Sequence, residues 1–210
     1  MATVAHAKVQ EVAAVPGRRE RNKLQKRARI VAAARDLFQR QGFADTTTQQ
    51  IADAADIGTG TLFLYARSKE DLLVMVFKDE MLETVRAIYA DLPAETPTVG
   101  RLLAVFNRMA DYHARDPDLS RLLLRELIVP SSPARSSDIA ELMDTIYDGL
   151  TDIIRADRRV DDPALVARSA FALYYFALIS WLGAGLDRAW SMRLLREQLT
   201  HLMIVGECHD

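Results

Sequence analysis

The apolar residues of this chain recur three and four positions apart along most of its 210 residues. This spacing places them on one face of an α-helix, whereas a half-buried strand needs an apolar residue at every second position. Proline and glycine stand mainly between the periodic runs, where helices end. The sequence therefore predicts an all-α fold, and the 50% of its residues that are hydrophobic suffices for a buried core.

About nine helices are predicted from the periodic runs and the residues that flank them. The first ends at Gly42, the second follows Thr46 and Thr47, and the fourth begins after Ser68 with Asp71 completing a capping-box-like start. The low-complexity segment 130–137, PSSPARSS, is predicted to be a surface loop. The first predicted helix spans residues 22–41, the second is a short helix that ends at the break at 56–58, the third spans 59–65, and the fourth is a long helix from 69. The remaining five are predicted at 98–115, 118–128, 138–156, 163–182 and 189–205.

Charge is distributed unevenly along the chain. Residues 18–69 contain eleven lysines and arginines against five acidic residues, a net charge of +6, whereas the whole chain has −2 and the remainder therefore −8. This asymmetry predicts one module that meets the phosphates of nucleic acid and another that does not. The basic run 18–29 is open to two interpretations, an arm along the minor groove or DNA backbone and a solvated flexible tail.

The chain ends and its cysteine content bear on the compartment. Residues 1–17 lack the basic start and long apolar run of a secretory signal and are predicted to form a disordered extension. The single cysteine, Cys208, excludes an intrachain disulfide and a cysteine-rich metal site, and it favours the reducing cytoplasm. Residues 169–186 are apolar and free of charge over nearly a membrane-spanning length, but Gly183 and Gly185 interrupt them. We predict no membrane segment there, and instead a helix buried at a subunit contact.

The most specific pattern lies in residues 42–72, GFADTTTQQIADAADIGTGTLFLYARSKEDL. Two short helices joined by a tight turn and packed on a longer first helix present the second short helix to the major groove of DNA. The stretch resembles the DNA-binding signature of the TetR/AcrR family of repressors. The residues that carry the resemblance are Gly42, Phe43, Thr46, Thr47, Ile51, Ala52, Ala55, Ile57, Gly60, Thr61, Leu62, Phe63, Tyr65, Ser68, Lys69 and Glu70.

The resemblance implies a domain organisation and a mechanism. A helix-turn-helix DNA-binding domain is expected at residues 18–70, and a helical effector-binding and dimerisation domain at residues 71–210. The homodimer is expected to bind a palindromic operator in duplex DNA, with helices 163–182 and 189–205 pairing with their copies in a four-helix bundle. A small amphiphilic effector in the second domain would change the spacing of the two recognition helices and release the DNA.

The resemblance also assigns roles to single residues. Thr48, Tyr65 and Lys69 align with phosphate contacts, and Thr47 is expected to cap the second helix. The full set of residues predicted to contact DNA is Thr47, Thr48, Gln49, Thr59, Gly60, Thr61, Phe63, Leu64, Tyr65 and Lys69.

Base recognition is expected from the groove side of the recognition helix. Thr59 and Thr61 lie on that side, where their hydroxyls reach base edges or phosphates. Thr59 stands at a position that is frequently basic in the family, so recognition is expected to depend more on Gln49, Gln50 and Thr61.

Three further departures from the family pattern affect the predicted helix-turn-helix. Gly58 stands where a serine usually caps the recognition helix, so capping should be weaker. Asp56 replaces a turn glycine, and Ala66 replaces a large aromatic residue that packs beneath the helix. The sequence does not specify how these departures change the affinity of the helix-turn-helix for DNA.

No motif marks the residues from 98 onward, although their apolar faces are rich in aromatic side chains and methionine. Such faces predict either the wall of an amphiphilic cavity or ordinary core. His113 is predicted to be a polar rim or satisfied core residue, which in a pocket would orient a ligand. The predicted pocket residues are Phe106, Met109, Tyr112, His113, Met143, Tyr147, Phe171, Tyr174 and Tyr175.

Two other classes of protein are alternatives to a DNA-binding regulator, an enzyme and a helical interaction protein. An enzyme has little support, because the four histidines are scattered without metal-ligand spacing and no catalytic motif, metal or cofactor site is predicted. The alternative is a helical interaction protein that acts through its C-terminal bundle without sequence-specific DNA binding. The preferred prediction is a cytoplasmic, ligand-responsive transcriptional repressor whose operator, regulated genes and effector the sequence does not specify.

Overall fold

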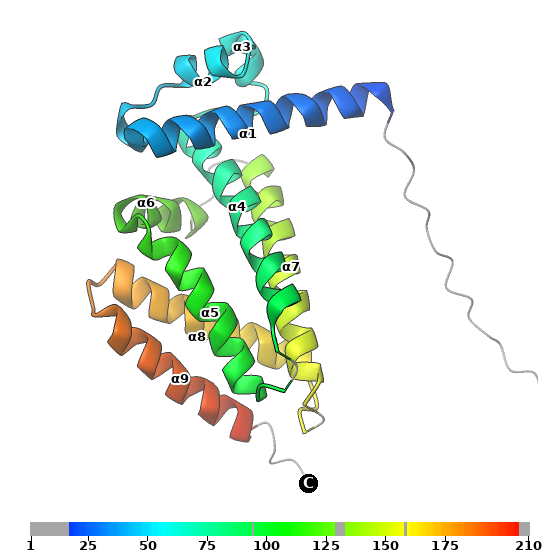
Figure 1. Ribbon diagram of the computed structural model, residues 1–210, viewed down its shortest axis with the longest axis vertical. Coiled ribbons are helices and arrows are strands. Elements are labelled where there is room, and N and C mark those ends of the chain that lie inside the picture. Colours follow the sequence, from blue (N-terminus) through cyan, green and yellow to red (C-terminus); the bar gives the residue numbers. More distant parts are fainter. Residues whose placement is uncertain (1–16, 94, 129–132, 158, 206–210) are drawn as a thin grey trace, which may run out of the picture.

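The computed structural model describes residues 17–93, 95–128, 133–157 and 159–205. Within these ranges the chain forms nine helices and no strand, which confirms the all-α prediction (Figure 1). The predicted disordered extension lies, apart from Gly17, outside the described residues. The helices are α1 (Arg18–Asp45), α2 (Thr48–Ala54), α3 (Thr59–Leu62), α4 (Lys69–Asp91), α5 (Thr98–Ala114), α6 (Pro117–Ile128), α7 (Pro133–Arg155), α8 (Pro163–Leu182) and α9 (Arg188–Val205).

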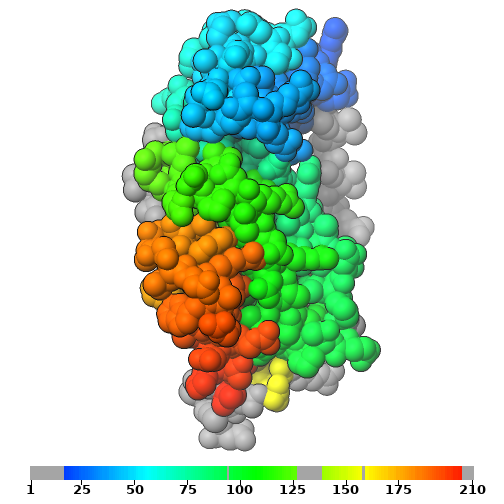
Figure 2. All heavy atoms as spheres, turned by 60° about the vertical axis from the view of Figure 1, so that its left-hand side comes forward, coloured from blue at the N-terminus to red at the C-terminus, as the bar shows by residue number. Residues whose placement is uncertain are grey.

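The first three helices form a lobe at one end of the molecule, which we call the head (Figures 1 and 2). Helix α1 buries Ile30, Ala34 and Phe38, the stripe that its periodicity predicts. Gly42 interrupts it with φ +82°, a conformation that favours glycine, as expected for the residue placed to end the helix. The start differs from the prediction, because α1 begins at Arg18 and includes the whole basic run.

Helix α4 connects the head to the rest of the protein. It packs against α1 of the head and against α5, α6 and α7 of the C-terminal helices (Figure 1). Its first turns are buried on several sides at once, from Leu72 to Lys78. Any displacement of α4 by a change among the C-terminal helices therefore reaches α1.

The predicted surface loop at 130–137 is wrong for residues 133–137, which belong to α7. Pro133 is the first residue of the helix, where its fixed φ suits the helix and its missing N–H costs no hydrogen bond. Residues 130–132 lie outside the described part of the chain. Pro133 thus marks a helix start.

Helix α8 is long and apolar enough to cross a membrane, and 39% of its most apolar window is buried in the protein. One such helix is weak evidence for a membrane segment, because the core helix of a soluble protein has the same composition. Helix α8 packs against α7 and α9 and buries Ala170, Tyr174 and Leu178. Its other side leaves Leu165 and Phe176 exposed, at 61% and 57% of their surface.

Candidate nucleic-acid interface and ligand cavity

Helix α2 begins with a complete capping box. The Thr47 hydroxyl accepts a hydrogen bond from the backbone N–H of Gln50 at 3.2 Å, and the Gln50 side-chain oxygen accepts one from the Thr47 N–H at 2.8 Å. The side chain of Gln41 adds a third contact by donating to the same Gln50 oxygen at 3.2 Å. The capping role predicted for Thr47 is confirmed. Gln50 belongs to the same cap, and its predicted contact with bases stays a prediction.

Helix α3 is shorter than predicted, because residues 63–65 form turns beyond Leu62. Its cap residue Gly58 offers no side-chain hydrogen bond, as the sequence predicts. The fully buried Leu62 anchors the helix, and the Thr59 hydroxyl donates to the side-chain oxygen of Gln49 at 2.6 Å. Asp56 forms the turn with φ +52°, a left-handed conformation that aspartate tolerates better than most residues.

The residues predicted to contact DNA all keep accessible surface on the head. Gln49 joins the two helices of the motif, because its side-chain oxygen accepts from Thr59 of α3 while its amide donates to Asp53 of its own helix α2 at 2.8 Å. Leu64 is 82% exposed and Phe63 47%, which is unusual for large apolar side chains. The accessible set is Thr47, Thr48, Gln49, Thr59, Gly60, Thr61, Phe63, Leu64, Tyr65 and Lys69.

Lys69 is fixed against the end of α1. Its ammonium donates to the carbonyl oxygens of Phe43 at 2.6 Å and Ala44 at 3.0 Å, and it lies 4.4 Å from the centroid of the Phe43 ring. An ammonium has three N–H groups, so one remains for a further acceptor. The cap of α4 lies beside it, where the Ser68 hydroxyl accepts from the Asp71 N–H at 3.2 Å as predicted.

The basic run 18–29 is neither an extended arm nor a flexible tail, because it is part of α1. Arg27 forms an ion pair with Asp79 of α4 at 3.1 Å, and Arg29 one with Asp56 at 3.7 Å. The flexible tail is therefore wrong for these residues, whereas a contact of the run with the minor groove or the DNA backbone stays a prediction. Charge density alone gave no sign that a helix would continue through the run.

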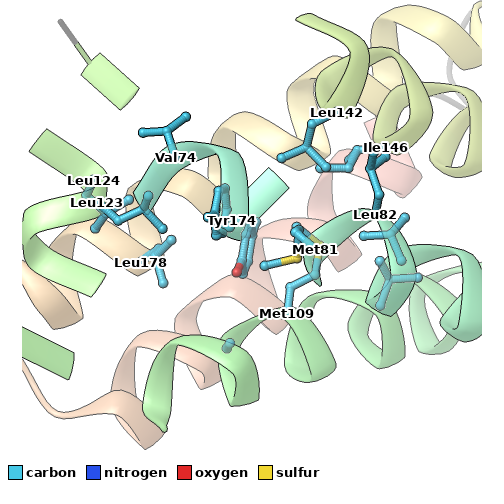
Figure 3. Packing of buried hydrophobic residues seen from close by; sticks show 14 of the residues in the cluster. Val74, Met81, Leu82, Met109, Leu123, Leu124, Leu142, Ile146, Tyr174 and Leu178 are labelled. Atoms are coloured by element: carbon cyan, nitrogen blue, oxygen red, sulfur yellow. The ribbon is translucent and has the colours of Figure 1, made fainter. Parts of the chain in front are cut away.

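An apolar cavity of about 190 Å³ lies among α4, α5, α6, α7 and α8. Figure 3 shows several of its wall residues, including Met81, Met109 and Tyr174, which extend toward one another from three different helices. Six of the predicted pocket residues line it: Met109, His113, Met143, Phe171, Tyr174 and Tyr175.

The other three predicted pocket residues lie outside the lining. Phe106 is fully buried and stacks on the ring of Tyr174, with centroids 4.7 Å apart. Tyr147 contacts Phe171 edge to face at 5.4 Å. Tyr112 faces a different cavity. The first two support wall residues from behind.

That second cavity, of about 240 Å³, lies at the junction of the head with the C-terminal helices. Arg35 of α1 forms an ion pair with Glu80 of α4 at 3.2 Å, and the Tyr112 hydroxyl of α5 donates to Glu80 at 2.6 Å. Phe77 lines both cavities. Sequence reasoning missed this polar link, because its residues are far apart in the chain and local periodicity does not pair them.

Two of the polar side chains in the wall of the apolar cavity, His113 and Tyr174, are almost fully buried. His113 is 3% exposed, and burial lowers its pKa to about 4, so the imidazole is neutral at pH 7. Tyr174 is 1% exposed, burial raises its pKa, and its hydroxyl has no hydrogen-bond partner among the described residues. Both groups remain uncharged at neutral pH.

No metal centre emerges from the described part of the chain, where no three His, Cys, Asp or Glu side chains cluster. Cys208 and its neighbours Glu207 and His209 lie outside the described residues. The described residues thus present an exposed polar surface on the head and, behind it, the two cavities lined by Phe77.

Comparison with known proteins gives these features a context. The family described as bacterial regulatory proteins, tetR family, matches residues 30–76. The HTH-type transcriptional repressor KstR of Rhodococcus jostii is 26% identical over 161 residues, which are 75% of this chain and 73% of that protein. The fatty acid metabolism regulator protein of Bacillus subtilis is 26% identical over 107 residues, 51% of this chain and only 55% of that protein.

A solved structure agrees over most of the chain. Thermus thermophilus FadR, a TetR family transcriptional repressor crystallised with lauroyl-CoA, superposes with a TM-score of 0.64 at 28% identity. The match covers 88% of this chain and 96% of that one. FadR from Bacillus subtilis, crystallised with stearoyl-CoA, has a TM-score of 0.58 at 21% identity over 87% of this chain and 99% of that one, and it supports the fold alone.

Proposed function

Because the chain belongs to the TetR family of ligand-responsive transcriptional regulators, we propose that it is a repressor that binds a palindromic operator in duplex DNA as a homodimer. The observation that carries this proposal is the exposed polar surface of α2 and α3, which lies inside the matched residues. In the proposal residues 18–70, which include the head, form the DNA-binding domain, and residues 71–210 bind the effector and form the dimer.

On this surface the side chains divide by the part of DNA that they meet. We assign phosphate contacts to Thr48, Tyr65 and Lys69, since hydroxyl and ammonium groups bind phosphate oxygens without regard to sequence. Thr61 and Gln49 are assigned to base edges in the major groove. The hydrogen bond between Gln49 and Thr59 supports this assignment, because it fixes α3 relative to α2 before DNA arrives.

The dimer is assigned to α8 and α9. These helices expose four large apolar side chains, Leu165, Phe176, Trp190 and Ile204, each at more than 40% of its surface. Exposed apolar residues concentrated on two neighbouring helices are typical of a contact with another protein. Pairing across a two-fold axis would set the recognition helices about 34–36 Å apart, one turn of the duplex.

The effector is assigned to the apolar cavity. Lauroyl-CoA in the Thermus relative supports an amphiphile with an apolar chain, such as a fatty acyl thioester. The cavity of about 190 Å³ is smaller than the roughly 300–1,000 Å³ of most ligand pockets. A larger ligand must therefore displace α4 or α7, and displacement of α4 changes the position of α1 and of the head.

The first test is selection of genomic fragments by the purified protein at near-physiological salt, followed by sequencing. Enrichment of a near-palindrome is expected. The affinity for that site should fall with a slope of about 0.9 log units per contacted phosphate for each decade of salt. Uniform recovery without a motif would instead favour the helical interaction protein.

Matched variants then test the assignment of roles. Tyr65→Phe removes one hydroxyl and should weaken all sequences equally, whereas Thr61→Val should change the preference among sequences. Glu95→Gln, at an exposed position between α4 and α5 and remote from the head, serves as a control and should change neither. The reverse pattern for the two head variants would overturn the assignment.

A further inference from the structure

We propose that the part of the effector inside the apolar cavity carries an O–H or N–H group, which donates a hydrogen bond to Nε2 of His113. The inference deepens the proposed function, because it takes the cavity as the effector site. It identifies the chemical class as a neutral apolar molecule, or the apolar portion of a larger one, that bears a hydroxyl or amide N–H.

The first step is the tautomer of His113, which its neighbour on α6 determines. The Ser120 hydroxyl donates to the backbone carbonyl of His113 at 3.1 Å, and its oxygen lies 3.2 Å from Nδ1 of the same residue. A serine hydroxyl has one hydrogen, and the carbonyl can only accept it. Nδ1 must therefore donate to the serine oxygen, which leaves Nε2 without a proton and able only to accept.

The second step is what surrounds that acceptor. Ser120 occupies the Nδ1 side of the ring, so His113 meets the cavity with the rest of the ring, which includes Nε2. None of the described residues donates a hydrogen bond to Nε2. A ligand that supplies a donor to this acceptor forms a hydrogen bond with it and so gains affinity there.

The third step is the absence of charge. No lysine, arginine, aspartate or glutamate side chain lines the cavity among the described residues. The imidazole is itself neutral, because its burial lowers the pKa to about 4. An ionised carboxylate or phosphate would find no counter-charge, so the charged part of an amphiphile must lie outside the cavity.

The fourth step separates candidate ligands. A saturated acyl chain has no donor and leaves Nε2 unsatisfied, whereas a hydroxylated acyl chain or a hydroxylated ring satisfies it. The hydroxyl of Tyr174, unpartnered in the same wall, is a candidate to donate to the ligand oxygen. The cavity exceeds the roughly 150 Å³ of an apolar cavity that holds benzene, so single-ring probes fit its size.

The experiment compares phenol with toluene, which differ mainly in one O–H donor. Binding of each to the full chain is measured by calorimetry or NMR titration, for the wild type and for His113→Phe. The difference in hydration between the probes enters the ratio of phenol to toluene affinity equally for both proteins, so it cancels when the two ratios are compared. The ratio should fall about tenfold in the variant, which corresponds to the loss of one hydrogen bond.

Two further variants guard the interpretation. Ser120→Ala frees Nδ1 and should also lower the ratio, and the ¹⁵N shifts of His113 should change from those of a single Nδ1–H tautomer. Thr145→Val removes a hydroxyl from α7 at a position outside the cavity lining and should leave the ratio unchanged. DNA plays no part in these measurements. Their failure would therefore not contradict the proposed repressor function, and failure to find an operator would not contradict the assignment to His113.

The overturning results are specific. An unchanged ratio in His113→Phe, a proton on Nε2 in the wild type, or no phenol binding to the wild type would each refute the proposal. A fall of the ratio in Tyr174→Phe but not in His113→Phe would transfer the anchor to the tyrosine and refute the assignment to His113.

Discussion

The head and the apolar cavity use polar side chains in opposite ways. On the head, Thr47 with Gln50 and Thr59 with Gln49 are exposed and pair with one another. In the cavity wall, by contrast, His113 is buried among apolar side chains, and the nearby tyrosine hydroxyl has no partner. Changes on the head should therefore affect local order and DNA contacts, whereas changes in the cavity should affect the stability of the whole fold.

The largest expected effect is an acid destabilisation that originates in the cavity. Burial lowers the pKa of His113 from 6.5 to about 4, so between these values the unfolded chain binds more protons than the folded protein. The contribution of His113 to the free energy of unfolding should be complete above pH 6.5. The free energy of unfolding should then fall by about 3 kcal/mol as the pH drops to 4.

Urea denaturation at a series of pH values measures this loss. His113→Phe should show a correspondingly flatter dependence over the same window, which isolates the histidine from carboxylates that titrate in acid. Equal slopes for the two proteins would show that His113 is not the source and that the contrast between cavity and head has another cause.

The second expected effect tests the link between the regions. Tyr112→Phe removes the hydroxyl that donates to Glu80, the residue that also pairs with Arg35 of the head. Loss of a partly buried hydrogen bond to a charged group should lower the free energy of unfolding by about 2 kcal/mol. Operator affinity without effector should change little, while the fold-change on adding effector should shrink.

Tyr147→Phe provides a matched control, because it removes a hydroxyl from a residue outside both cavity linings and keeps the ring that contacts Phe171 and Arg168. If Tyr112→Phe leaves the effector response intact, the polar link does not couple the two regions.

A smaller effect is expected at the start of α2. Thr47→Ala removes the side-chain cap and should lower the free energy of unfolding by about 1 kcal/mol, measured by chemical denaturation. Thr47→Ser retains the hydroxyl and should restore most of the loss. An equal loss in both variants would mean that the threonine methyl, and not the capping hydrogen bond, stabilises the head.

The smallest effect is a gain at the start of α3. A side chain at Gly58 would meet nothing within 4 Å, and the backbone there, with φ −70° and ψ 146°, suits a capping residue. Gly58→Ser should stabilise the head by a few tenths of a kcal/mol, seen as slower amide exchange in residues 60–62. Gly58→Ala, which has no acceptor, should show no such slowing.

Local signals in the sequence predicted most of the fold. Helix α8 begins and ends at the predicted residues, because Pro163 fits a first turn and an apolar run continues to Leu182. The same reasoning failed at Arg18, where a run of like charges hid a helix whose arginines pair with Asp56 and Asp79, residues distant in sequence. Tertiary partners decide such cases, and they are not visible locally.

The cavity shows the same limit more sharply. Phe106 and Met109 lie three residues apart on one buried face of α5, and the periodicity treats them alike. Only Met109 lines the cavity, because the ring of Phe106 is stacked on the ring of Tyr174. Periodicity identifies the buried face, whereas the position of a void depends on how side chains from several helices fit together.

The shared position of Phe77 has a consequence for the two cavities it separates. Because the same ring lines both cavities, a shift of its position would enlarge one cavity at the expense of the other. Filling the apolar chamber would press the ring toward the polar chamber beside α1, and a molecule lodged in the polar chamber would oppose that movement. The protein thus holds two adjoining compartments whose capacities trade against each other across one side chain.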